Sequence, residues 1–142
     1  MKRMFLAFAA VLVSATIFAQ TTGQKAQDLV KFKESTYDFG KIKQGTPVTH
    51  EFVFTNVSNR PVTIENATAT CGCTTPVWPA PPVAKGKTEK ITAGFNAAAV
   101  GPFTKSIYVK LAGIDVPVEL RITGEVLSPE NYSKLPKGSK KG

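Results

Sequence analysis

The chain has 142 residues, 42% of them hydrophobic, and a formal net charge of +8. This length accommodates one domain of ordinary size around a single core. Nucleic-acid binding is disfavoured, because much of the excess lysine lies towards the ends of the chain and not among aromatic residues of a folded face.

The first 19 residues have the pattern of a secretory signal peptide. Lys2 and Arg3 form a basic start, residues 5–18 form an apolar run, and Ala19 offers a small residue for cleavage. The run is shorter than the ~20 apolar residues that span a bilayer, which disfavours an uncleaved anchor. We therefore expect export, no transmembrane segment after cleavage, and an N-terminal linker over residues 20–30.

Residues 31–127 alternate apolar and polar side chains in short runs separated by Gly, Pro, Asn and Asp. This alternation is typical of β-strands, which we expect near residues 48–55, 90–95, 103–110 and 116–126, with another strand that opens at Val62 and Ile64. Strands that recur about every ten residues indicate two antiparallel sheets packed face to face. The prediction is an all-β, single-domain, immunoglobulin-like antiparallel β-sandwich of about seven strands, with a small closed barrel as the alternative.

The end of the folded region carries two further signals. Pro117 cannot donate to a sheet ladder, so the last strand is expected at a sheet edge or unpaired at that residue. Residues 128–142 combine lysine with Pro, Ser and Gly, and this composition predicts a basic disordered tail.

Five short motifs together resemble a bacterial family. They are Tyr37-Asp38-Phe39-Gly40, Gly45, residues 52–56, the block from Cys71 to Pro76, and Gly101-Pro102-Phe103. This pattern is similar to the DUF1573 family, whose domains resemble the immunoglobulin-like domains of the ASPM, SPD-2 and Hydin group. The resemblance implies an exported protein of a Gram-negative bacterium, typically from the Bacteroidetes, located in the periplasm or at the cell surface. It implies no activity, because the family has no settled one.

The pair Cys71-Gly72-Cys73 is the one arrangement that suggests chemistry. In an extended segment both thiols point to the same side, and their Cα atoms lie near the upper limit of the ~4.4–6.8 Å window for a disulfide unless Gly72 introduces a kink. Three interpretations remain open. The cysteines are structural, they form a thiol redox site, or they bind a soft metal ion such as copper or half of a zinc site.

Two other residues are candidates for a site. His50 shares a strand face with Phe52 and Phe54, which predicts a partly covered rim residue, with a metal-ligand role as the alternative. Trp78 lies in a proline-rich segment near the cysteines, where it either caps the open end of the core or forms an exposed interaction site.

No nucleophile elbow or phosphate-binding loop is present in the sequence, and His50 is its only histidine. We therefore expect a non-catalytic module without a cofactor that binds a protein or an envelope component. The alternative is thiol redox chemistry or soft-metal binding through Cys71 and Cys73.

Overall fold

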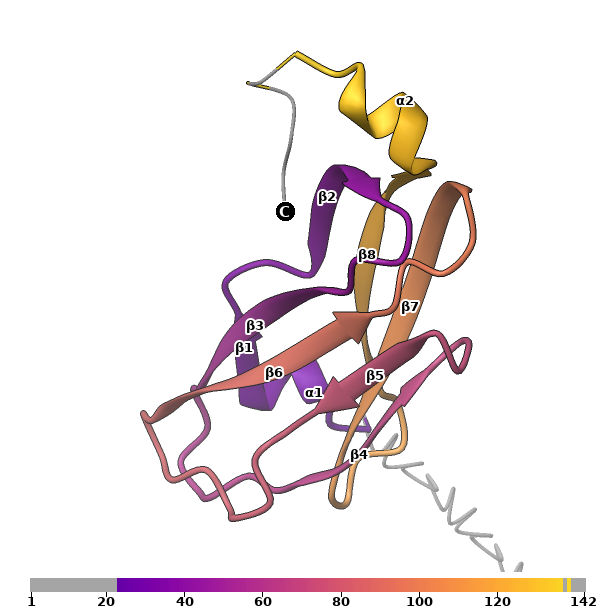
Figure 1. The fold of residues 1–142 in the computed structure, drawn as a ribbon. Coiled ribbons are helices and arrows are strands. Elements are labelled where there is room, and N and C mark those ends of the chain that lie inside the picture. Colours follow the sequence, from indigo (N-terminus) through magenta and orange to yellow (C-terminus); the bar gives the residue numbers. More distant parts are fainter. Residues whose placement is uncertain (1–22, 137, 139–142) are drawn as a thin grey trace, which may run out of the picture.

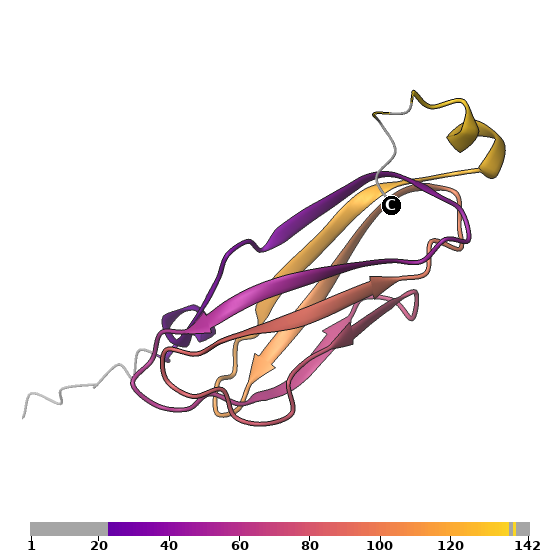
Figure 2. The ribbon, with the colours of Figure 1, turned by 60° about the vertical axis from the view of Figure 1, so that its left-hand side comes forward.

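The computed structural model describes residues 23–136 and 138, so the expected signal peptide over residues 1–19 lies outside the described residues. Two four-stranded sheets pack face to face as a sandwich (Figures 1 and 2). The predicted all-β, immunoglobulin-like sandwich is confirmed. It has eight strands in the described part of the chain, where the sequence predicted seven.

Sheet A contains four strands in the order β1-β3-β6-β5. Their bounds are Val30–Phe32 for β1, Val48–Asn56 for β3, Thr88–Phe95 for β6 and Thr74–Val77 for β5. All neighbouring strands in this sheet run antiparallel. The two outer strands are much shorter than the two central ones, which explains why the sequence pattern did not single them out.

Sheet B contains the other four strands in the order β2-β8-β7-β4. Their bounds are Thr36–Lys43 for β2, Val118–Leu127 for β8, Gly101–Leu111 for β7 and Ile64–Ala69 for β4. The strands β2 and β8 run parallel, so the prediction of purely antiparallel sheets is wrong at this pair. After β1 the chain crosses from sheet A to sheet B and continues in the same direction as β2. Because β8 also runs in this direction, the pair is parallel.

Of the two alternatives expected for the last strand, the edge position is wrong and the absence of pairing at Pro117 is confirmed. The strand β8 is central, because it pairs with β2 on one side and β7 on the other. Pro117 stands immediately before Val118, the first residue of β8, where a missing N–H removes no ladder hydrogen bond.

The core lies between the sheets and is filled by alternate residues of each strand. In β3, Phe52 and Phe54 are fully buried, and in β8, Leu120 and Ile122 are fully buried. The intervening polar residues face solvent, as the two-residue period of a strand requires.

A bulge in β2 shapes the start of sheet B. Pairing with β8 shifts register between Asp38 and Lys41, and Gly40 adopts a positive φ of 66° there. The Gly40 N–H donates to Asp38 Oδ1 at 2.8 Å. A Cβ on Gly124 would lie 2.8 Å from both the Gly40 carbonyl oxygen and the Phe103 ring. The glycines therefore allow β2, β8 and the Phe103 ring to approach closely.

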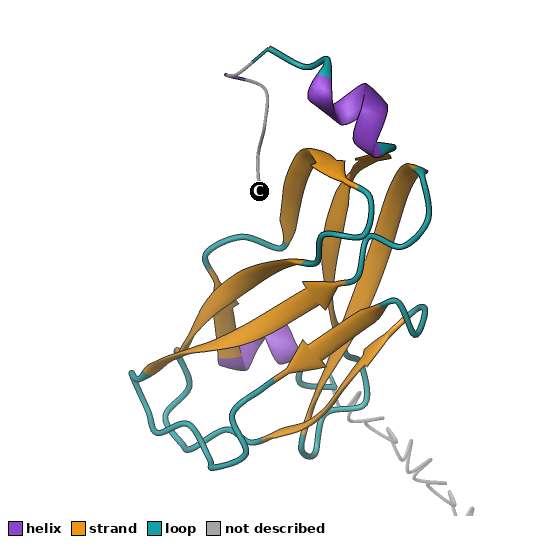
Figure 3. Cartoon of the chain, in the orientation of Figure 1, coloured by secondary structure: helices purple, strands orange, loops and turns teal. Residues whose placement is uncertain are grey.

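Two short helices flank the strands (Figure 3). Helix α1 (Ala26–Leu29) buries Ala26 and Leu29 against the core, so the sandwich begins within the segment expected to be a linker. Helix α2 (Pro129–Ser133) begins after Ser128, whose Oγ accepts from the Asn131 N–H at 3.3 Å. The expected disordered tail therefore starts with a capped helical turn.

Candidate functional site

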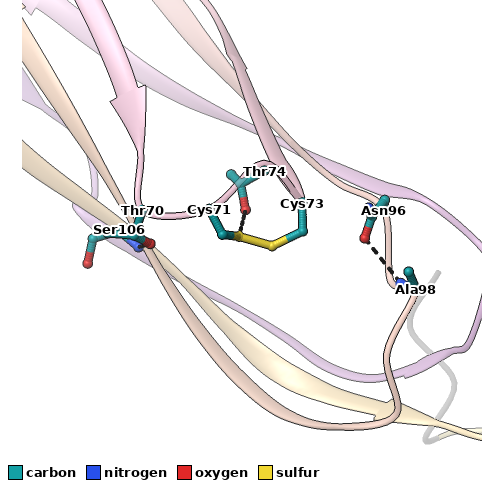
Figure 4. Close-up of a disulfide and its surroundings, with 7 residues drawn as sticks. All are labelled: Thr70, Cys71, Cys73, Thr74, Asn96, Ala98 and Ser106. Atoms are coloured by element: carbon teal, nitrogen blue, oxygen red, sulfur yellow. Dashed lines mark hydrogen bonds between the residues drawn. A yellow bond between two sulfur atoms is a disulfide. The ribbon is translucent and has the colours of Figure 1, made fainter.

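The disulfide between Cys71 and Cys73 lies in the connection from β4 in sheet B to β5 in sheet A (Figure 4). The two Cα atoms are 5.3 Å apart, well inside the range for bridged cysteines. The Thr74 N–H donates to the Cys71 carbonyl at 3.2 Å and closes a tight turn around Gly72. The kink anticipated at Gly72 therefore brings the sulfur atoms together.

The disulfide turn is connected to the neighbouring turns at the same end of the sandwich. The Cys73 carbonyl accepts from the Asn96 N–H at 3.1 Å, and Asn96 Oδ1 accepts from the Ala98 N–H at 3.1 Å. Ala97 is buried, has a positive φ of 52°, and accepts from the Gly45 N–H at 2.9 Å. We call this assembly, formed by residues 44–47, 70–73 and 96–100, the disulfide end.

The residues that follow the disulfide close the outer edge of β5. The hydrogen bond between the Cys73 carbonyl and the Asn96 N–H shows that the backbone N–H and C=O groups of residue 73 face β6. Because these groups alternate sides along a strand, those of residues 75 and 77 also face β6, and those of Thr74 and Pro76 face the outer edge. The Thr74 N–H is already bonded to Cys71, and Pro76 has no N–H. The edge of β5 therefore offers no free backbone donor to another strand. Natural proteins protect edge strands in this manner.

His50 links the two sheets at the opposite side of the sandwich. Its Nε2 lies 2.9 Å from Glu34 Oε1, and its ring stacks on Tyr37 with 3.6 Å between centroids. The side chain is 17% exposed, as expected for a partly covered rim residue. Because β6 lies between β3 and β5, the structure does not bring His50 together with Cys71 and Cys73.

Trp78 follows β5 and packs, partly buried, against the core. The four residues of β5 separate it from the disulfide, a distance of roughly 13 Å along an extended strand. Trp78 and the cysteines are therefore separated along the sandwich, with Trp78 next to the middle of β6, although the sequence suggested that they are close together. The contact with the core matches the expected capping role.

The end opposite the disulfide is organised by Asn56, which the sequence analysis included as the last residue of the motif over residues 52–56 but did not select as a site residue. Its buried side chain donates to the carbonyls of Arg60 at 2.8 Å and Val83 at 2.9 Å. Its Oδ1 accepts from the N–H and Oγ of Ser58, at 2.9 and 2.7 Å. One amide thus holds together two loops that lie far apart in the sequence.

A polar network lies on the outer face of sheet B. Glu119 Oε1 accepts from Ser106 Oγ at 2.6 Å and from Arg121 Nη2 at 2.8 Å. The hydrogen bond from Ser106, followed by that from Arg121, lowers the pKa of Glu119. The hydrogen bond to Glu119 in turn raises the pKa of Arg121. These groups are solvent-exposed, so the network stabilises the fold only weakly.

Metal binding is the remaining chemical possibility. Within residues 23–136, no group of three or more His, Cys, Asp or Glu side chains is placed to hold a metal ion. Both sulfur atoms are joined in the disulfide. A thiolate metal site would therefore first require reduction of the Cys71–Cys73 bond.

The family model for a protein of unknown function, DUF1573, matches residues 30–126. The chain belongs to this family. The match begins at β1 and ends within β8, so the family domain and the sandwich coincide. The resemblance suggested by the motifs around Phe39 and Cys71 is confirmed.

Solved structures share the fold of this DUF1573 domain at low sequence identity. A protein of unknown function from Porphyromonas gingivalis W83 is 13% identical, with a TM-score of 0.58 over 78% of this chain and 51% of that chain. The ASH, or PapD-like, domain 7 of human CEP192 is 8% identical, with a TM-score of 0.62 over 89% of this chain and 99% of that one. The SrpA adhesin of Streptococcus sanguinis is 10% identical, with a TM-score of 0.52 over 76% and 62%.

These likenesses establish the fold and not a function. The chain spans about half the length of the Porphyromonas gingivalis protein. A search of curated proteins found no match. Among the described residues, no helix has the length and apolar character needed to cross a membrane.

Proposed function

We propose that this DUF1573 chain is an exported, non-catalytic module that binds a protein or an envelope component in the periplasm or at the cell surface of a Gram-negative bacterium. The signal-peptide pattern of residues 1–19 supports export. The observation that carries the proposal is the largely apolar packing between the sheets, where Asn56, Ser58 and Thr74 are the buried polar residues among those described, with polar residues on both outer faces and at the edges. Recognition would therefore occur on the outside of the sandwich.

Site-specific photo-crosslinking in intact cells tests this proposal. A crosslinking amino acid is placed at Val77, Val100 or Tyr108, whose side chains are 64%, 54% and 40% exposed. We expect at least one position to capture a discrete envelope partner, while the same amino acid at the fully buried Phe52 captures none. Failure at every exposed position, together with turnover of a thiol substrate by the purified chain, would contradict the proposal.

Export is tested by cell fractionation. The full-length chain should appear in the envelope or medium without its first 19 residues, and a variant lacking those residues should remain in the cytoplasm. A full-length protein that stays in the cytoplasm with an intact N-terminus would overturn the assignment.

A second candidate function is thiol exchange at the disulfide. The specific observation is that Cys71 and Cys73 are both partly exposed in a turn whose central residue, Gly72, is exposed. In this reaction the disulfide would accept two electrons and two protons from a dithiol protein, whose own thiols would become a disulfide. Reduced Cys71 and Cys73 would also offer two thiolates to copper or zinc.

The intact mass of protein taken from the envelope without reductant separates these states. A bridged form that resists a glutathione buffer supports a structural disulfide, whereas ready equilibration with that buffer supports exchange. Mass increments equal to a metal ion, with two thiolates retained, would indicate the metal-bound form. Rapid alkylation of reduced protein at neutral pH is the corresponding test for a reactive thiol.

A further inference from the structure

The outer edge of β3 remains without a neighbouring strand over much of its length. The strand β1 pairs only with residues 54–56 of β3. One further bond joins the Lys33 N–H to the Val53 carbonyl at 2.9 Å, after which the chain crosses to sheet B. Residues 48–52 of β3 therefore pair with β6 on one side only.

The direction of the free backbone groups follows from the bond between Lys33 and Val53. Because backbone groups alternate sides along a strand, the N–H and C=O of Thr49 and Glu51 point to the same outer edge as the Val53 carbonyl. No backbone partner for these four groups is present in residues 23–136. In contrast to the edge of β5, this edge keeps its N–H donors.

The charged side chains around this edge favour an acidic partner. Glu51 pairs with Lys90, and Glu34 is bonded to His50. Lys33 lies at one end of the free stretch, and Lys43 precedes the turn that leads into its other end. Within the described chain, neither lysine takes part in an ion pair. The Glu51 carboxylate is thus paired with a lysine and the Glu34 carboxylate is bonded to His50, while a lysine outside any ion pair lies at each end of the free stretch.

We propose that the edge of β3 from Thr49 to Val53 binds an extended, acidic segment of a partner protein, which adds to sheet A as an antiparallel strand in line with β1. Main-chain hydrogen bonds to Thr49 and Glu51 would supply affinity, and acidic side chains near Lys33 and Lys43 would supply selectivity. A second copy of this chain fits the edge poorly. An antiparallel pair of two β3 strands centred on the free stretch would place Glu51 of one copy opposite Glu51 of the other, and like charges directly opposite each other are destabilising. This inference rests on the proposed binding function and assigns its surface.

Two matched variants test the edge with a defined probe, a synthetic peptide of alternating valine and threonine flanked by glutamates. Glu51→Pro removes the outward N–H and the Lys90 ion pair, whereas Glu51→Ala removes only the ion pair. We expect Glu51→Pro to weaken peptide binding about tenfold more than Glu51→Ala, as loss of edge hydrogen bonds would do. Thermal melting establishes that both variants are folded.

A second measurement changes only the peptide. N-methylation of the residues whose N–H groups face β3 should abolish binding, and N-methylation of the alternate residues should leave it unchanged. A peptide flanked by lysines should bind more weakly than the one flanked by glutamates. Equal binding of the two N-methylated peptides, or of the acidic and basic peptides, would overturn the inference.

Crosslinking in cells separates this inference from the function on which it rests. A crosslinker at Lys33 should capture a partner in the chain with Glu51→Ala but lose it with Glu51→Pro. If a partner is captured equally in both variants, the edge assignment is wrong and the binding function stands. If no exposed position of the chain captures a partner, both fail.

Discussion

The loops at the two ends of the sandwich are held in place by different interactions. At the disulfide end, a covalent bond between Cys71 and Cys73 shapes a partly exposed turn that passes from one sheet to the other. At the opposite end, the buried amide of Asn56 organises two loops through four hydrogen bonds. The cysteines attract attention in the sequence, yet the buried amide has more partners that would lose their hydrogen bonds on substitution.

The two ends are expected to contribute differently to the stability of the domain. Removing the buried amide of Asn56 removes four hydrogen bonds and leaves the Ser58 N–H without its partner, which is costly. A disulfide that closes a loop of three residues restricts the unfolded chain very little. Opening the disulfide should therefore cost less stability than removing the Asn56 amide.

The largest effect is expected for Asn56→Ala. The substitution removes four hydrogen bonds and leaves the Ser58 N–H without its partner, while Ser58 Oγ and the Arg60 carbonyl stay bonded to each other, so we expect a loss of about 3 kcal/mol in the free energy of unfolding. Urea denaturation measures it. Asn66→Ala is the control, since the exposed Asn66 donates only to Thr68 Oγ1, at 3.1 Å. Similar losses for the two variants would remove the contrast between the ends.

Gly124→Ala tests the packing of sheet B near the disulfide end. The new Cβ would meet the Gly40 carbonyl oxygen and the Phe103 ring, both at 2.8 Å. The backbone oxygen cannot move away easily, so we expect a destabilisation of about 2 kcal/mol, measured by thermal unfolding. Gly113→Ala is a comparison at a position with open space around it, and both glycines have a positive φ, 76° at Gly113 and 158° at Gly124. An unchanged melting temperature for Gly124→Ala would contradict the close approach.

Replacing both Cys71 and Cys73 by alanine should have a smaller effect. Loss of the covalent link over so short a loop is expected to cost about 1.5 kcal/mol, measured by urea denaturation without reductant. The wild-type chain in reductant provides a matched comparison, since it keeps both side chains. If the double variant lost more free energy of unfolding than Asn56→Ala, the disulfide end would contribute more to stability than the end around Asn56, contrary to this prediction.

The smallest effect is expected from the network on the outer face of sheet B, which lies between the two ends. Because folding lowers the pKa of Glu119, its contribution is present above the ordinary carboxyl pKa of 4.5 and disappears as the pH falls through the folded value. Ser106→Ala removes the main cause, so its urea midpoint should differ slightly from wild type at neutral pH and converge in acid. Thr104→Ala on the same strand provides the control. A difference that grows in acid would mean that the hydrogen bond favours the protonated carboxyl.

The sequence predicted the strands correctly where the alternation of apolar and polar residues extends over eight or more residues. The alternation in residues 48–55 and 116–126 predicted the two strands that bury Phe52, Phe54, Leu120 and Ile122. It did not identify β1 and β5, because three or four residues do not establish a period. It selected Cys71 and Cys73 from their spacing, but it could not show that Asn56 would be surrounded by partners from a distant loop.

The sequence alone determined the fold class, the family and the possibility of a disulfide, because side-chain alternation and motif spacing are local properties. Only the tertiary structure decided which strand edges are closed and which remain open. It also separated His50 and Trp78 from the cysteines. These relations depend on which strands become neighbours, and strand order arises from the packing of the whole chain.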